Sequence, residues 1–249
     1  MQTSISLIEG WPEGVQAAWT SRGPGPHTDS YHGFNLGLHV GDDPARVLAN
    51  RRTLGETLGA QPVWLDQVHG TDVHHITEPP HASPPKADAA MTQLIGQAAC
   101  VMAADCLPVL VSSLDGRWVG AAHAGWRGLA AGVLERLLQS MLLAQEDPRR
   151  GFRVWLGPCI GPEAFEVGPE VVAAFGLTTA KPSHRAGHFM LDLSGLAEAR
   201  LQAWAQAQAI PLQIAGLPTD CTFTRADQFY SHRRQAPSGR MAFLIWRKA

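Results

Sequence analysis

The sequence predicts a mixed α and β fold, of the α+β class, with layered sheets covered by helices in one domain spanning residues 1–249. Three observations lead to this prediction. Helical and strand patterns interleave along the whole chain, several strand patterns are apolar almost throughout, and no repeat period divides the sequence. Because a strand that is apolar on both faces needs cover on both faces, the sheets are expected to lie inside the molecule.

The first element with a clear signal is a helix over residues 44–58. Asp43 is suited to cap its N-terminus, Pro44 fits the first helical position, and Gly59 ends it. Three apolar residues at helical spacing form its predicted buried face: Val47, Leu54 and Leu58. The proline-rich stretch at 78–85 is predicted to be a loop rather than a domain boundary.

Residues 98–124 are typical of core strands that end in polar residues. Their apolar runs have the length of strands and are broken by Asp105 and Pro108. A turn is expected at Asp115-Gly116, between the second and third runs.

A second helix is predicted to begin near Trp126 and to end by Asp147-Pro148. One buried stripe runs along it, formed by Leu129, Val133, Leu137 and Met141. Its stripe is expected to pack against the strands of the preceding segment.

The C-terminal third of the chain continues the alternation of helices and strands. A strand is expected over 152–156, and Ser194 is predicted to cap a third helix that runs roughly to Ala209. The apolar stretch 241–246 is predicted to be a closing strand.

Charge and hydropathy exclude several classes of protein. The chain has 20 Lys and Arg against 22 Asp and Glu, and this near-neutral balance argues against nucleic acid as the main partner. No run of 18 apolar residues occurs, so no membrane span is expected. The first residues lack the basic region of a signal peptide and reach Glu9 before any long apolar stretch, which leads us to expect a cytoplasmic location.

Histidine and cysteine residues carry the chemical signal, because the chain lacks the common phosphate-binding, hydrolase and zinc-protease motifs. His69, Cys106 and His123 each lie beside tight-turn residues, at a strand end or before a helix. Two imidazoles and one thiolate could bind Zn²⁺ and leave a fourth position for water or substrate. The alternative is a buried thiol and two hydrogen-bonded histidines, since no short spacing ties the three together.

Five segments in a fixed order give a specific resemblance: QVHG, ADCLPVLV, AAHAGWRG, LGPCIGP and FYSHRR. They resemble the YfiH family, the bacterial laccase-domain proteins, and matching segments extend from about Trp19 to Trp246. The resemblance implies a four-layer α/β/β/α sandwich and a metal site formed by His69, Cys106 and His123. Zn²⁺ is the expected ion, with copper as the alternative, because imidazole and thiolate also accept copper.

The family has been described as a polyphenol oxidase, a purine nucleoside enzyme and a peptidoglycan editing factor. The absence of any His-x-His pair argues against a multicopper oxidase. The leading hypothesis is a zinc-dependent enzyme that cleaves adenosine, inosine and S-methyl-5′-thioadenosine with phosphate and also deaminates adenosine. Its expected catalytic residues are the three metal ligands together with Asp105, a candidate proton shuttle that could equally be a strand-end cap.

Phosphorolysis needs cationic groups for phosphate, and arginines are the natural candidates. The expected substrate contacts are Arg22, Asn35, Arg51 and Arg127. The family also carries arginine at the positions of Arg22 and Arg51. Each arginine could instead be a structural or solvated ion-pairing residue. The turn after Arg22 departs from the family pattern, since Pro24 removes a backbone N–H donor there.

Three alternatives remain open at the level of sequence. Cys106 could be the nucleophile of a hydrolase that acts on an amide of a peptidoglycan precursor, with His123 or His69 as its base. A copper-loaded protein could act as a polyphenol oxidase. A non-catalytic, structural zinc site would need a fourth protein ligand, which Cys100, Cys159 or His75 would have to supply.

Overall fold

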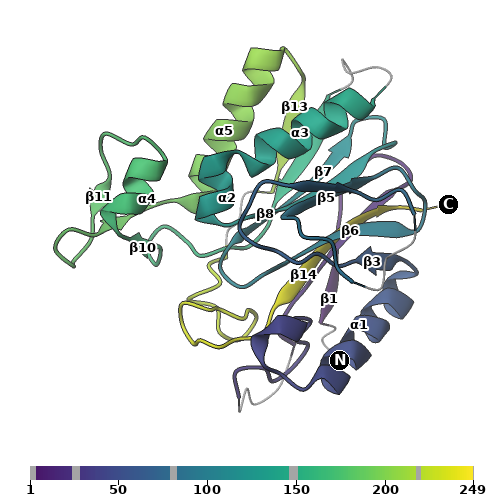
Figure 1. The fold of residues 1–249 in the computed structure, drawn as a ribbon, viewed down its shortest axis with the longest axis horizontal. Helices are drawn as coiled ribbons and strands as arrows, with labels where there is room; N and C mark the ends of the chain where they lie inside the picture. Colours follow the sequence, from purple (N-terminus) through teal and green to yellow (C-terminus); the bar gives the residue numbers. More distant parts are fainter. Residues whose placement is uncertain (1–3, 24–28, 79–82, 146–150, 217–219, 249) are drawn as a thin grey trace.

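The computed structural model of this chain describes residues 4–23, 29–78, 83–145, 151–216 and 220–248. Two β-sheets pack face to face at its centre, and helices cover the outer face of each sheet (Figure 1). This arrangement confirms the predicted mixed α and β fold and the four layers that the family resemblance implied.

The first sheet has five strands and contains both ends of the described chain. In spatial order the strands are β1 (Ile5–Ile8), β2 (Val15–Thr20), β14 (Met241–Arg247), β6 (Gln97–Ala103) and β3 (Gln61–Val63). The closing strand β14 lies antiparallel to both β2 and β6, in the middle of the sheet. The predicted strand at 241–246 is therefore confirmed and extends by one residue.

The second sheet has six strands. In spatial order they are β13 (Leu212–Ala215), β9 (Phe152–Leu156), β7 (Leu107–Ser113), β8 (Val119–Ala124), β5 (Ala89–Thr92) and β4 (Val73–His75). The strand predicted over 152–156 is confirmed as β9, and the apolar runs of residues 98–124 become β6, β7 and β8.

Pro108 was predicted to break the apolar run, and this prediction is wrong. Pro108 lies within β7, opposite His123 of β8. Its carbonyl accepts a hydrogen bond from the N–H of Gly157, so its nitrogen points to the same side, toward β9. The pairing of β7 with β9 begins only at Val109, so the missing N–H removes no hydrogen bond between these strands.

Helix α1 (Pro44–Leu58) covers the outer face of the first sheet and has the predicted ends. The Asp43 carboxylate accepts a hydrogen bond from the N–H of Ala45, and Gly59 ends the helix in a left-handed conformation. The short 3₁₀ helix η1 (Leu38–Val40) precedes it. Of its predicted apolar face, Val47 and Leu54 are buried and Leu58 is partly buried.

The predicted second helix is two helices, α2 (Trp126–Ala131) and α3 (Val133–Ala144). Gly132 separates them with a φ of 98°, a left-handed conformation that glycine adopts without steric cost. The predicted stripe is buried across both helices against the second sheet. The predicted end at Asp147-Pro148 lies outside the described residues.

The third predicted helix is α5 (Leu193–Gln208), which packs beside α3 on the same sheet (Figure 1). Its N-cap is Asp192 and not Ser194. The Asp192 carboxylate accepts hydrogen bonds from the N–H of Gly195 and from the hydroxyl of Ser194, so the serine lies inside the first turn. Ala209 ends the helix close to the predicted position.

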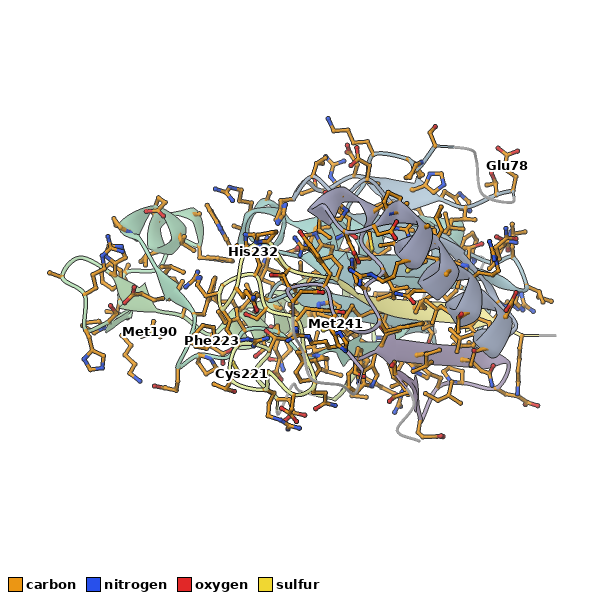
Figure 2. All side chains as sticks on the ribbon, turned by 90° about the horizontal axis from the view of Figure 1, so that it is seen from below. Glu78, Met190, Cys221, Phe223, His232 and Met241 are labelled. Atoms are coloured by element: carbon orange, nitrogen blue, oxygen red, sulfur yellow. The ribbon has the colours of Figure 1, made fainter. Side chains whose placement is uncertain are left out.

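A small unit projects from the side of the sandwich and was not predicted. It consists of α4 (Pro169–Ala174) and a three-stranded sheet, β10 (Glu166–Val167), β12 (Phe189–Met190) and β11 (Lys181–Pro182). In Figure 2, Met190 marks this unit at one end of the molecule, and Cys221 and Phe223 lie between it and Met241.

Three apolar clusters correspond to the spaces between the four layers. One lies between the second sheet and the helices α3 and α5, one between the two sheets, and one between the first sheet and α1. In the described residues, no helix is long and apolar enough to cross a membrane.

The buried stripe of α3 should carry a large share of the stability of the helix-covered face. Leu137→Ala removes a side chain that is 1% exposed and should lower the free energy of unfolding by about 2–5 kcal/mol. Leu143→Ala on the same helix removes a side chain that is 78% exposed and should change it by less than about 0.5 kcal/mol. Urea denaturation measures both, and equal losses in the two variants would contradict this packing.

Candidate metal centre

Three residues from different parts of the chain bring their ligand atoms together. His69 lies in the loop between β3 and β4, Cys106 follows β6, and His123 belongs to β8. Their nitrogen and sulfur atoms all lie within 4.8 Å of one another, and Cys106 Sγ lies 3.8 Å from His69 Nε2. Zinc bound tetrahedrally to imidazole and thiolate places its ligand atoms about 3.3–3.6 Å apart, so this cluster fits such an ion after small adjustments.

The orientation of His123 is set by a buried carboxylate. His123 is 4% exposed, and its Nδ1 lies 2.8 Å from Oδ1 of Asp88. Its backbone N–H also donates to the carbonyl of Asp88. With Nδ1 held by the carboxylate, Nε2 is the ring atom left for a metal, which is the usual arrangement of a metal-binding histidine.

Asp88 also shapes the turn that carries His69. Its two carboxylate oxygens accept hydrogen bonds from the backbone N–H groups of Val68, His69 and Gly70, at 2.6–3.0 Å. His69 has a φ of 60°, a left-handed conformation that is uncommon for residues other than glycine. These hydrogen bonds stabilise the turn, and together with that of His123 they hold the pKa of Asp88 below its usual value in spite of its burial.

Asp88 was not among the functional residues predicted from the sequence. The available signal was a single acidic residue directly before the apolar strand β5, which is equally typical of a strand-end cap.

Cys106 is positioned by a second carboxylate, that of Asp105. Asp105 also has a positive φ, of 93°. Its oxygens accept hydrogen bonds from the hydroxyls of Thr222 and Ser231 and from the N–H of Arg233, at 2.7–3.0 Å. Both oxygens therefore bind the C-terminal loops to the turn of Cys106. This role fits a structural cap better than a proton shuttle.

Gly125 allows the close approach of the three ligands. A Cβ at this position would lie 2.7 Å from Cδ2 of His69 and 3.0 Å from Sγ of Cys106. A Cβ at Gly128 would lie 2.8 Å from the carbonyl oxygen of Gly70. The glycines of the AAHAGWRG segment are thus needed for helix α2 to begin directly against the cluster.

The cluster has an unusual charge distribution without a metal. Burial acts to raise the pKa of Cys106, but the charge of His123 and hydrogen bonds from both histidines lower it to about 6. Burial acts to lower the pKa of His123, whereas the thiolate and Asp88 raise it to about 9. The metal-free protein therefore holds a thiolate beside an imidazolium at neutral pH, and a bound cation would replace the proton.

The three residues that could close the site as a fourth ligand lie elsewhere. Cys100 is buried in the cluster between the first sheet and α1, and Cys159 donates a hydrogen bond to the carbonyl of Ile160. His75 packs against Trp118, with ring centroids 5.2 Å apart. Burial raises the pKa of both thiols, so neither favours a thiolate. Among the described residues, the ligand group consists of His69, Cys106 and His123.

Two of the expected substrate contacts use their hydrogen-bonding groups within the protein. The side-chain amide of Asn35 bonds Asp42 and Gly37, and its oxygen accepts the N–H groups of Gly37 and Arg240. Arg22 is 5% exposed, donates to the carbonyls of Asp29 and His32, and lies over the ring of Tyr230. Both residues fix the local fold. Pro24 lies outside the described residues.

The other two expected contacts are more open. Arg127 is exposed and lies 4.3 Å from the centre of the Trp126 ring. Arg51 donates from Nε to the carbonyl of Leu36 and stacks on Trp64, 3.9 Å from the ring centre. Neither has an acidic partner among the described residues.

Comparison with known proteins identifies the family. The family model described as multi-copper polyphenol oxidoreductase laccase matches residues 16–248. The chain belongs to this family. Among its curated relatives are proteins named purine nucleoside phosphorylase from Pseudomonas aeruginosa (43% identical, covering 96% of this chain and 97% of the relative) and purine nucleoside phosphorylase YfiH from Escherichia coli (42%, covering 96% and 98%).

Solved structures of YfiH-like proteins share the fold. A Neisseria meningitidis protein superposes with a TM-score of 0.86 at 37% identity, covering 99% of this chain and 100% of that one. The YfiH protein of Bacillus licheniformis also gives a TM-score of 0.86, at 26% identity, covering 99% of this chain and 97% of that one. The YfiH resemblance of the sequence motifs is thereby confirmed.

Removing the charge of Asp88 should weaken metal binding. Asp88→Asn should lower the affinity for Zn²⁺ by about 10- to 100-fold, because the amide orients neither His123 nor the His69 turn as the carboxylate does. Competition with a chromogenic chelator measures the affinity. Asp72→Asn, at an exposed position nearby, is the matched control and should bind Zn²⁺ as the wild type does. A wild-type affinity for Zn²⁺ in Asp88→Asn would show that the carboxylate does not support the site.

The lowered pKa of Cys106 predicts its reactivity without metal. In chelator-treated protein, the rate of alkylation by iodoacetamide should rise with pH and reach half of its maximum near pH 6, because the thiolate is the nucleophile. Mass spectrometry of Cys106 peptides over pH 4–9 measures the profile, and added Zn²⁺ should suppress the reaction. A midpoint near that of an ordinary thiol, about 8.5, would contradict the charge distribution.

Proposed function

We propose that this chain is a metal-dependent purine nucleoside phosphorylase. It cleaves adenosine and inosine to the free base and ribose 1-phosphate, and S-methyl-5′-thioadenosine to adenine and 5-methylthioribose 1-phosphate. We propose further that it deaminates adenosine. The names of the relatives, over nearly the whole chain, support the first activity. The proposal depends on one observation. The cluster offers three ligands, and the described residues place no fourth ligand beside them. An open position is typical of a catalytic rather than a structural metal site.

Zn²⁺ is the ion we propose, with copper as the alternative, held by His69, Cys106 and His123. When bound, it would supply Lewis acidity and lower the pKa of water, which is the chemistry that deamination requires. The protein itself contributes orientation. Asp88 fixes the ring of His123 and the turn of His69, and Asp105 fixes the turn of Cys106.

In phosphorolysis, an oxygen of hydrogen phosphate forms a bond to C1′ of the ribose and the bond from C1′ to the base breaks. The base leaves with the bonding electron pair and takes up the proton that the phosphate releases. The reaction therefore needs a site that holds a phosphate beside the nucleoside, and small molecules are the proposed partners. We place the activity in the cytoplasm, because four unpaired cysteines are typical of a protein in a reducing compartment.

A second candidate is a hydrolase in which Cys106 is the nucleophile, acting on an amide such as that of a peptidoglycan precursor. The thiolate next to two imidazoles favours it. A trapped acyl-thioester on Cys106 in metal-free protein would support this function, whereas sensitivity to chelators without an adduct would support the metal-dependent one. A copper polyphenol oxidase is less well supported, since the described residues contain one three-ligand group and a multicopper oxidase needs several copper sites.

Loss of the thiolate should abolish the proposed activity. Cys106→Ala should lower the rate of phosphate-dependent adenine release from adenosine by about 100-fold or more, because it removes a metal ligand. Cys221→Ala removes a thiol outside the cluster and should retain the activity. Chromatographic separation of adenine, inosine and hypoxanthine measures phosphorolysis and deamination in one assay. Equal rates in the wild type and Cys106→Ala would refute the proposal.

A further inference from the structure

Two arginines near the metal cluster keep unused hydrogen-bond donors. Arg240, directly before β14, donates from Nη1 to the carbonyls of Ser238 and Gly239 and to the Ser238 hydroxyl, while its Nε and Nη2 have no acceptor among the described residues. Arg51, on α1, uses Nε for the carbonyl of Leu36. Among the described residues, the one hydrogen-bond acceptor of its Nη2 is the thioether of Met102, a weak acceptor. Arg51 is one of the substrate contacts expected from the sequence, and Arg240 is not.

The segment 35–37 holds both arginines in place. The N–H of Arg240 donates to Asn35 Oδ1, and its carbonyl accepts the N–H of Leu36. The carbonyl of Leu36 also accepts a hydrogen bond from Nε of Arg51. A Cβ on Gly37 would lie 2.9 Å from Cγ of Arg240, so the segment packs closely on that side chain. Asn35 thus assembles the cationic residues rather than contacting a substrate.

Both arginines are linked to the segments that carry the metal ligands. Arg51 Nη2 lies 3.7 Å from Sδ of Met102, and the backbone of Met102 bonds both amide atoms of Gln67, two residues before His69. Arg240 is close enough to Cys106 for the thiolate charge to act on its pKa. Both arginines therefore belong to the same region of the fold as the metal ligands.

His39, on η1 directly after the 35–37 segment, adds a third donor. Partial burial of its ring and the charges of Arg240 and Arg51 lower the pKa of His39, so the neutral ring offers one N–H donor. Asp66 also reaches His39 electrostatically. Among the described residues, however, no carboxylate forms an ion pair with Arg51 or Arg240. Half-buried cations without an acidic partner are costly to maintain unless an anion binds there.

We propose that Arg51, Arg240 and His39 form a binding subsite for a phosphate group beside the metal cluster. The free N–H groups of two guanidiniums suit a tetrahedral oxyanion, which they can bind through several charge-assisted hydrogen bonds. Arg22 donates to the carbonyls of Asp29 and His32. Arg127 lies on α2 and makes no hydrogen bond to the 35–37 segment among the described residues, so these two arginines are not part of this subsite. The assignment of the ligand as the phosphate co-substrate rests on the proposed function.

Calorimetric titration of the metal-loaded protein with inorganic phosphate tests the subsite. Arg240→Gln and Arg51→Gln should each weaken binding by about 10- to 100-fold, because each removes charge-assisted hydrogen bonds. His39→Gln changes an exposed side chain and should weaken it less, by about 10-fold. Arg52→Gln, an exposed neighbour on α1, is the matched control and should bind as wild type. Circular dichroism and the unfolding midpoint show whether each variant is folded.

A parallel titration with adenosine 5′-monophosphate distinguishes a free phosphate ion from the phosphate of a nucleotide. Loss of inorganic phosphate binding in the variants identifies the free ion, and loss of nucleotide binding alone identifies a nucleotide phosphate. Wild-type affinity for both ligands in folded Arg240→Gln, Arg51→Gln and His39→Gln would overturn the subsite, as would the absence of any phosphate binding by the wild type. If the wild type releases no base from nucleosides but loses phosphate binding in these variants, the proposed function fails and the subsite stands.

Discussion

The buried carboxylate of Asp88 is the constraint on which the candidate site depends. One side chain accepts three backbone N–H groups from the turn of His69 and pairs with the ring of His123. It therefore fixes the distance between two ligands from different segments: His69, which precedes β4, and His123, which lies in β8. Without it, the left-handed conformation of His69 would lose its hydrogen bonds and the tautomer of His123 would be free to change.

The sandwich places the third ligand. Strand β6 belongs to the first sheet and β7 to the second, so the short connection that contains Cys106 crosses from one sheet to the other. This crossing ends beside His123 because β7 pairs with β8, with Leu107 opposite Ala124. Asp105 anchors the crossing to the C-terminal loops. The same C-terminal region contributes Arg240, whose pKa is affected by the charge of Cys106.

Local patterns predicted much of the fold. The apolar runs gave the core strands, and the Asp43-Pro44 start of α1 was confirmed because capping depends on adjacent residues. The predictions were wrong where two local structures fit the sequence equally well and tertiary contacts select one of them. Gly132 divides a continuous apolar stripe, and Asp192 rather than Ser194 caps α5.

The ligands themselves could not be paired from spacing, since they are far apart in sequence, and the family motifs supplied them. Asp88 lies in none of those motifs, so its role emerges only when distant segments meet.

The central claim is that His69, Cys106 and His123 bind one divalent ion and leave one position open. X-ray absorption spectroscopy at the zinc edge of the metal-loaded protein tests it directly. The account predicts one sulfur near about 2.3 Å and nitrogen or oxygen ligands at about 2.0–2.1 Å, with the sulfur signal lost in Cys106→Ala. A coordination shell without sulfur, or one with a second sulfur, would contradict it.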